Sequence, residues 1–231
     1  MKPCSLSWRD YVFLGMGRRL SRMGEVLGVE KLVYNRFVFQ SFDRDTAVNA
    51  PGVISAIREV FPNCRKLADI GCGSGSYAKE AIRQGLSAVA CEYSSYGRRL
   101  TQRQGVECTS FDLNKSPPAD LYGNIDLTYC FEVAEHLSPE LGNKLVGFLT
   151  YLSPVIVFSA AQPGQIGIGH INLQPSSYWM ETFFKEGCSF NETVTKLLVD
   201  GFAKHKVRSP WFFQNVMVFN QTKSLDPQRT K

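Results

Sequence analysis

One nine-residue stretch, Leu67–Gly75, constrains the possible fold more than any other part of the chain. Its first half is apolar apart from one acid and is typical of a buried strand, whereas its second half has glycines at alternate positions, Gly71, Gly73 and Gly75. A helical pattern of apolar residues begins at about Tyr77. A strand, a glycine-rich turn and a helix form the first unit of a nucleotide-binding α/β fold, because glycine lets a ligand lie against the main chain. The turn also aims the unpaired N–H groups of the helix start at the ligand.

The spacing of these glycines argues against one class of ligand site. A dinucleotide fingerprint reads G-x-G-x-x-G, but here the pattern is G-x-G-x-G, and Ser76 follows it. A nicotinamide-dependent oxidoreductase is therefore the weakest of the functions considered. Asp69, just before the glycines, suits a cationic ligand better than a pyrophosphate.

At this point the sequence resembles the class I S-adenosylmethionine-dependent methyltransferases, whose first motif is a strand ending in D-x-G-x-G-x-G. Asp69 and the three glycines match all four of those positions. The resemblance covers roughly residues 66–220. It implies that S-adenosylmethionine, which carries an ammonium and a sulfonium but no phosphate, is the cofactor. The cofactor-binding residues expected in this motif are Asp69, Gly71, Cys72, Gly73 and Gly75.

Strands and helices alternate regularly along the rest of the chain. After the first strand, further strands are predicted at residues 87–93, 106–112, 124–131, 154–159 and 216–219. Helices are predicted at residues 51–61, 94–104, 138–152, 176–186 and 191–206, and Ser138 is predicted to be the N-cap of the third of these. This alternation indicates an α/β fold with a mostly parallel sheet covered on both faces, and the resemblance implies a Rossmann-like, doubly wound, seven-stranded sheet. We expect the methyltransferase domain at residues 51–220, an N-terminal helical extension or lid at 1–50, and a polar tail at 221–231.

Acidic residues end two of the predicted strands, and ligands of such sheets bind at the carboxyl ends of strands. Glu92 lies 19 residues after Gly73, and a carboxylate at that distance can accept hydrogen bonds from both ribose hydroxyls. Asp112 ends the next strand, where an acid can accept from an adenine amino group while Leu113 covers the ring. In the family that this sequence resembles, the corresponding acid contacts adenine. We therefore expect Glu92, Tyr93, Asp112 and Leu113 to bind the nucleoside.

The string F-E-V-A-E-H-L at residues 131–137 follows the fourth strand and is similar to the corresponding string of small-molecule methyltransferases of this class. The resemblance implies that the backbone here, at Cys130 and Phe131, meets the methionyl part of the cofactor. Glu132 and His136 follow directly and are candidate catalytic residues.

A metal site is left open at the same place. In a helical turn Glu132, Glu135 and His136 project to one side, and His170 follows the next strand at the same sheet edge. Two carboxylates and two imidazoles are a possible ligand set for a divalent ion, and similar E-x-x-E-H strings in ubiquinone O-methyltransferases and small-RNA 2′-O-methyltransferases are linked to metal. In the alternative, the glutamates lie at a helix N-terminus and His136 packs beside the cofactor. We predict no metal, since many methyltransferases with this string need none.

The loop at residues 162–175 is a candidate substrate loop. Three glycines make it a flexible hinge, and polar residues recur at alternate positions, His170, Asn172 and Gln174, before the aromatic residues Tyr178 and Trp179. Histidine is the usual base near neutral pH, so His170 is predicted to remove or guide the proton of an acceptor hydroxyl.

Length, charge and cysteine content limit the kinds of protein and the cellular compartment that this sequence fits. A chain of 231 residues can bury one good core, and its net charge of +5 permits an anionic partner without demanding nucleic acid. Residues 1–50 are more basic, with eight Lys or Arg against five acids, and this fits a lid or a contact to an anionic surface as well as a solvated helix face. Seven cysteines without a C-x-x-C motif indicate reduced thiols. We see no signal peptide or transmembrane run and expect a cytoplasmic protein.

The predicted activity is therefore methyl transfer from S-adenosylmethionine to a hydroxyl of a small molecule or glycan. The absence of a D/N-P-P-Y/F string argues against methylation of exocyclic amines in DNA, and the absence of Pro-Cys after the fourth strand argues against cytosine C5 chemistry. Two alternatives remain: an RNA-modifying 2′-O-type enzyme that uses the basic N-terminus and a metal, and a non-catalytic module that only binds the cofactor. The acceptor and the oligomeric state are left open.

Overall fold

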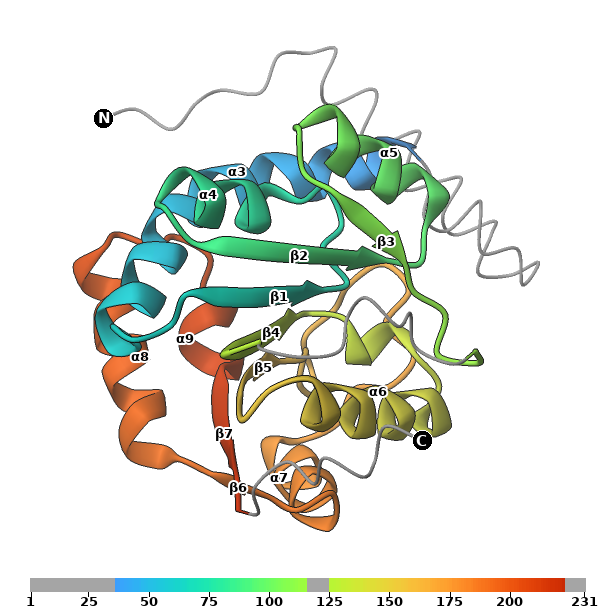
Figure 1. Ribbon diagram of the computed structural model, residues 1–231. Coiled ribbons are helices and arrows are strands. Elements are labelled where there is room, and N and C mark those ends of the chain that lie inside the picture. Colours follow the sequence, from blue (N-terminus) through green and yellow to red (C-terminus); the bar gives the residue numbers. More distant parts are fainter. Residues whose placement is uncertain (1–35, 116–124, 223–231) are drawn as a thin grey trace.

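The computed structural model describes residues 36–115 and 125–222, so most of the predicted N-terminal extension and polar tail lies outside the described residues. The centre of the fold is a seven-stranded sheet in the order β3-β2-β1-β4-β5-β7-β6 (Figure 1). Its strands are β1 (Lys66–Ile70), β2 (Ser87–Glu92), β3 (Cys108–Ser110), β4 (Leu127–Phe131), β5 (Val155–Ser159), β6 (Cys188–Phe190) and β7 (Met217–Gln221). Neighbours among β1 to β5 pair in parallel, and β7 runs antiparallel to both β5 and β6. The predicted Rossmann-like, mostly parallel sheet of seven strands is confirmed.

Helices cover both faces of this sheet, as predicted (Figure 1). The described helices are α3 (Arg36–Val60), α4 (Ser76–Arg83), α5 (Ser95–Arg103), η2 (Ala134–His136), α6 (Pro139–Leu152), α7 (Ser176–Lys185), α8 (Glu192–Lys204) and α9 (Trp211–Asn215). Apolar residues of α3, α4, α8 and α9 form one core cluster, and those of α6 and α7 form another on the opposite face. None of the helices in the described part of the chain is long and apolar enough to cross a membrane.

Successive residues of each strand point to opposite faces, and this alternation divides the two cores. In β1, Leu67 belongs to the core under α3 and α4, whereas Ala68 and Ile70 belong to the core under α6 and α7. In β5, Val157 and Phe158 are both fully buried and divide in the same way. Burial of side chains of this size stabilises the fold by about 1.5–3 kcal/mol each.

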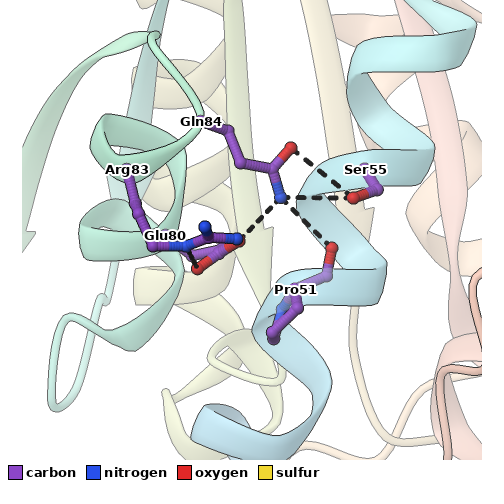
Figure 2. A network of polar contacts seen from close by, with 5 residues as sticks. All are labelled: Pro51, Ser55, Glu80, Arg83 and Gln84. Carbon is purple, nitrogen blue, oxygen red and sulfur yellow. Dashed lines mark hydrogen bonds and ion pairs between the residues drawn. The ribbon is translucent and has the colours of Figure 1, made fainter.

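The helix predicted to begin at Pro51 is part of the longer helix α3, which contains Pro51 in its interior. The predicted domain boundary between residues 50 and 51 therefore falls inside one helix. Proline lacks an N–H and costs a helix one hydrogen bond, but α3 also packs along α4 and α8. Figure 2 shows how the end of α4 ties to α3: the side-chain amide of Gln84 donates to the carbonyl of Pro51 at 3.3 Å and to the hydroxyl of Ser55 at 3.2 Å.

Strand β6 was not predicted from the sequence. Its three residues lie between Gly187, which ends the turn after α7, and Asn191, whose side chain caps α8 by accepting from the Val194 N–H. A three-residue edge strand is too short to give a period-2 signal, so only its pairing with β7 defines it.

The Ser138 cap of α6 was predicted correctly, and its hydroxyl accepts from the N–H of Leu141 at 3.3 Å.

Candidate active site

A cavity of about 550 Å³ opens at the carboxyl ends of β1, β2 and β4. Strand β1 pairs with β2 on one side and β4 on the other, so the chain order reverses here, and such a reversal is where ligands bind in open α/β sheets. The lining residues come from α3, from the ends of these strands and the turns after them, from the segment after β3, from α6 and from the loop after β5. They are Phe39, Phe42, Ile70, Gly71, Gly73, Glu92, Tyr93, Ser94, Phe111, Asp112, Leu113, Asn114, Glu132, Val133, His136, Leu137, Ser138, Leu141, Leu145 and Ile171.

The glycine-rich turn forms one wall, and its three glycines serve different purposes. All three have positive φ angles, which side chains with a Cβ rarely adopt. A Cβ on Gly71 would lie 2.5 Å from Val133, and one on Gly75 would lie 2.5 Å from Thr101, so these two glycines permit close packing. At Gly73, by contrast, no heavy atom of the described residues lies within 4 Å of the ideal Cβ position. The space over Gly73 is therefore part of the cavity and is available to a ligand.

Glu92 lies beside this turn and connects it, through hydrogen bonds, to the turn that follows β2. Its Oε2 accepts from the Gly73 N–H at 2.9 Å, and its Oε1 accepts from the Ser94 N–H at 2.7 Å. Burial raises the pKa of Glu92, and these two main-chain N–H groups offset part of that rise. Each carboxylate oxygen has two lone pairs, so one on each oxygen is left for a pair of hydroxyls. The geometry suits the predicted role toward a ribose.

Asp112 and Leu113 line the far end of the cavity, where the nucleoside was predicted to bind. The Oδ1 atom of Asp112 accepts from the Asn114 N–H at 3.0 Å, and Lys115 lies 3.4 Å from Oδ2. These contacts, the Asn114 N–H first, lower the pKa of Asp112 and keep its carboxylate charged near neutral pH. Phe111 stacks on Phe148, with ring centroids 4.4 Å apart, and adds an apolar surface suited to a flat ring.

Asp69, which was predicted to bind the cofactor, does not line the cavity. Strand alternation directs its neighbour Ile70 to the wall, while Asp69 is only 3% exposed. Burial raises its pKa to about 8, which the Tyr129 hydroxyl and the Ala78 N–H partly offset. Its Oδ2 has no hydrogen-bond partner of good geometry among the described residues, although the Tyr129 hydroxyl is close enough to affect the pKa.

This burial predicts a pH-dependent stability. The folded pKa of Asp69 is above its unfolded value, so the folded state holds a proton that the unfolded state has lost. The free energy of unfolding should therefore fall as pH rises from about 4 to about 8, by an amount on the order of a few kcal/mol. Asp69→Asn should remove this slope, as urea titrations at several pH values would measure. The same variant tests cofactor binding, because an unchanged affinity for S-adenosylmethionine would remove Asp69 from the cofactor site.

The turn after β4 adds two ionisable residues to the wall, Glu132 and His136. Glu132 has a φ of 53°, which is uncommon for a residue other than glycine. Its main-chain N–H donates to the Ser159 carbonyl, and its carboxylate accepts from the side-chain amide of Asn215 at 3.2 Å. Burial raises the pKa of Glu132 despite these hydrogen bonds.

The structure brings three residues of the predicted E-x-x-E-H cluster and its partner loop together. Ligand atoms of Glu135, His136 and His170 lie within 4.8 Å of one another, and the Glu132 carboxylate accepts from Asn215 and also interacts with the Glu135 carboxyl. The rings of His136 and His170 meet edge to face, with centroids 4.9 Å apart. Burial lowers the pKa of both imidazoles, that of His136 to about 4, and raises the pKa of Glu135 well above its usual range.

Other residues predicted for the site lie beside the cavity and not on its wall. Cys72 faces Thr101 and Cys108, Cys130 is fully buried, and Phe131 packs among the aromatic rings of the core. His170 and Gly75 are also absent from the lining, whereas Gly71, Gly73, Glu92, Tyr93, Asp112, Leu113, Glu132 and His136 belong to it.

The loop at residues 162–175 does not present the predicted polar row to the cavity. Ile171 lines the wall, whereas Asn172 is 2% exposed and donates to the Ala134 carbonyl at 3.4 Å. Trp179 was predicted as an aromatic wall but is fully buried in the core beside Phe158. The residues missed by the sequence analysis include Phe39 and Phe42, which cover the cavity from α3. No local sequence signal placed this segment over the sheet edge.

Comparisons with known proteins agree with this geometry. Residues 68–151 match the family model described as "Methyltransferase domain". No curated protein matches the sequence at a significant level. The fold is similar to that of CalS10, an amino pentose methyltransferase from Micromonospora echinaspora, with a TM-score of 0.61 and 13% identity over 82% of this chain and 98% of that chain. It is also similar to the sugar N-methyltransferase KedS8 from Streptoalloteichus sp ATCC 53650, with a TM-score of 0.61 and 15% identity over 82% and 94%.

A third similar structure is the mitomycin 7-O-methyltransferase MmcR, with a TM-score of 0.62 and 13% identity over 93% of this chain and 68% of that chain. The matched residues contain the glycine-rich turn, Glu92, Asp112 and the turn after β4. Residues 68–151 are therefore similar to a methyltransferase domain, and the chain has the fold of these solved methyltransferases.

Proposed function

We propose that this protein transfers the methyl group of S-adenosylmethionine to a hydroxyl of a small molecule or glycan. The observation that carries this proposal is one cavity that joins the bare main chain at Gly73, the Glu92 carboxylate and the acidic group of Glu132. When bound, S-adenosylmethionine supplies a methyl group on a positively charged sulfur. The names of CalS10 and KedS8 give sugar acceptors, with KedS8 acting on nitrogen, and the name of MmcR gives an oxygen acceptor, so they support a small-molecule acceptor more directly than its hydroxyl.

The residues of the cavity suit the proposed cofactor. The open space over Gly73 admits an extended ligand against the turn, and the two oxygens of Glu92 suit a diol. Phe111 and Leu113 offer apolar surface beside the charged Asp112, a combination that suits an adenine ring. Phe39 and Phe42 cover the opening and exclude water, which strengthens electrostatic interactions inside.

Glu132 is the residue that we assign to the acceptor proton. Bound S-adenosylmethionine would supply the methyl group and would be left as the neutral thioether, and the Glu132 carboxylate would take up the proton of the acceptor hydroxyl. Its raised pKa makes it a stronger base than an exposed carboxylate, and Asn215 fixes its orientation. His136 and His170, the other catalytic candidates, pack edge to face, and their Nδ1 atoms lie within hydrogen-bond distance of the Gly169 and Gln165 carbonyls.

The acceptor class can be tested with a radiolabelled methyl donor and a panel of sugars, phenols, hydroxy acids and RNA. We expect an alkali-stable methyl ether on a small molecule and release of S-adenosylhomocysteine. Product on nitrogen alone, or on RNA with rates that fall steeply with salt, would overturn the hydroxyl proposal. Cofactor binding without product across the whole panel would indicate a binding module.

Glu132→Gln should separate catalysis from binding. The change keeps the shape and the contact to Asn215 but removes the base, so we expect the turnover number to fall about 10²- to 10⁴-fold, with cofactor affinity within about threefold of wild type. Glu140→Gln is the matched control, because Glu140 is an exposed carboxylate of α6 that pairs only with Lys144 in the described contacts. Single-turnover rates and calorimetric affinities would measure both effects. Equal rates for Glu132→Gln and wild type would remove the proton-accepting role.

A further inference from the structure

We propose that Glu135, His136 and His170 bind one divalent first-row transition-metal cation, such as Zn²⁺, at the edge of the cavity. This site goes beyond the proposed methyl transfer and does not depend on the acceptor. It also changes the sequence-based expectation of no metal, and it selects three of the four residues that the sequence left open.

The first observation is the position of the three side chains. Their ligand atoms lie within 4.8 Å of one another, although His170 is 34 residues from His136 in the sequence. Metal–ligand bonds of about 2.0–2.2 Å place tetrahedral ligand atoms about 3.4 Å apart. Side-chain rotations that move each ligand atom by about 1 Å would therefore bring the three residues to coordination distance of one ion. The residues come from η2 and from the loop after β5, and these two segments already contact each other.

The second observation is the environment of Glu135. Its side chain is 0% exposed, and neither carboxylate oxygen has a hydrogen-bond partner of good geometry among the described residues. The main-chain N–H groups of Glu135 and Ala161 and the Glu132 carboxyl are close enough to affect its pKa, but they make no hydrogen bond of good geometry. A buried carboxyl without such partners is costly, and coordination of a cation removes that cost.

The third observation concerns the histidines. The Nδ1 atom of His136 lies 3.2 Å from the Gly169 carbonyl, and that of His170 lies 3.1 Å from the Gln165 carbonyl. A carbonyl can only accept, so the neutral tautomer that satisfies both contacts has its proton on Nδ1 and its lone pair on Nε2. An imidazole whose other nitrogen donates to a carbonyl is the usual arrangement of a metal-binding histidine.

The residue types determine the class of cation. Two imidazoles and one carboxylate favour Zn²⁺ and its first-row neighbours, whereas Mg²⁺ and Ca²⁺ prefer sites made of oxygen ligands. The set of three does not include Glu132, whose carboxylate accepts from the side-chain amide of Asn215. Three protein ligands leave at least one coordination position open.

A cation bound by His170 would link the loop at residues 162–175 to Glu135 and His136 beside the cavity wall. The carbonyl of Glu135 already accepts from the N–H groups of Ile171 and Asn172, at 2.9 and 3.0 Å. His136 and Ile171 both line the cavity, and His170 lies between them in contact with the His136 ring. Metal binding should therefore order the wall on which the acceptor rests, with His136 and His170 holding the ion and Glu132 accepting the proton.

The test is calorimetric titration of the full-length, chelator-treated protein with Zn²⁺ and Mn²⁺, with Mg²⁺ as the comparison ion. We expect one equivalent of Zn²⁺ to bind at least 100-fold more tightly than Mg²⁺. Co²⁺ should give the visible absorption of a four- or five-coordinate site without a thiolate charge-transfer band. Affinity for S-adenosylmethionine is measured separately, so failure of the cofactor assignment and failure of the metal site are distinguishable.

Variants locate the ion. Glu135→Gln and His170→Ala should each lower Zn²⁺ affinity at least 100-fold, while His205→Ala, which removes the third histidine of the chain at its ion pair with Glu59, should leave it unchanged. Gly167→Ala retains all three ligands but brings a Cβ to 2.2 Å from Nε2 of His170, so it should also weaken binding. If Glu135→Gln does not fold, His170→Ala still tests the metal site, because His170 is only partly buried and its replacement should leave the fold intact. Wild-type Zn²⁺ affinity in His170→Ala, or no Zn²⁺ binding to the wild type, would overturn the proposal.

Discussion

Gly73→Ala should abolish measurable binding of S-adenosylmethionine, with a loss of affinity of at least about 100-fold. The added methyl group would meet no protein atom within 4 Å in the described chain, so it would project into the cavity where the ligand must lie against the main chain. The φ of +58° adds strain, because a left-handed conformation costs alanine about 1–2 kcal/mol. Calorimetry with S-adenosylmethionine and S-adenosylhomocysteine would measure the affinity, and thermal unfolding would measure the strain.

Gly85→Ala is the matched control for this experiment. Gly85 also has a positive φ, of +87°, and the described residues likewise leave the space around its Cβ position open. It lies between α4 and β2, at the amino end of the strands and therefore at the sheet edge opposite the cavity. Both variants should lose similar stability, but only Gly73→Ala should lose cofactor affinity. Equal affinities for the two variants would show that the cofactor does not use the turn.

Glu92→Gln should lower cofactor affinity by about 30- to 100-fold while leaving the fold intact. The carboxylate accepts from two main-chain N–H groups, at Gly73 and Ser94, and a glutamine offers only one acceptor oxygen and brings an amide N–H toward the other donor. The change therefore removes one hydrogen bond that holds the glycine turn and one acceptor for a ribose hydroxyl. Both losses act on the same ligand, and so the expected effect exceeds that of a single hydrogen bond.

A ligand analogue separates these two contributions. If Glu92 accepts from the ribose, the loss caused by Glu92→Gln should shrink for an analogue that lacks the 2′- and 3′-hydroxyls. Glu80→Gln is the control, because Glu80 is a nearly buried carboxylate that instead binds Arg83 and Gln84 beside α3, away from the cavity (Figure 2). An undiminished loss for the analogue would assign Glu92 to the turn alone.

The sequence alone determined the parts of this protein that depend on neighbours along the chain. The strand, turn and helix from Leu67 onward, Glu92 at the end of β2, Asp112 just after β3, and the Ser138 cap were predicted because each depends on residues a few positions apart. The mostly parallel sheet followed from the alternation of such units. These features placed Gly73, Glu92 and Asp112 at one sheet edge, as the structure shows.

Only the tertiary structure decided which of the neighbouring side chains face the cavity. Asp69 lies away from the wall because strand alternation turns Ile70 toward it, and the Glu132 carboxylate accepts from Asn215, which lies 83 residues later in the chain. Phe39 reaches the cavity because α3 packs along α4, and His170 reaches His136 because the loop docks on the Glu135 carbonyl. Contacts between distant segments depend on burial and on hydrogen bonds that no local sequence pattern encodes. The local sequence therefore determines where the site lies, and the contacts between distant segments determine which side chains line it.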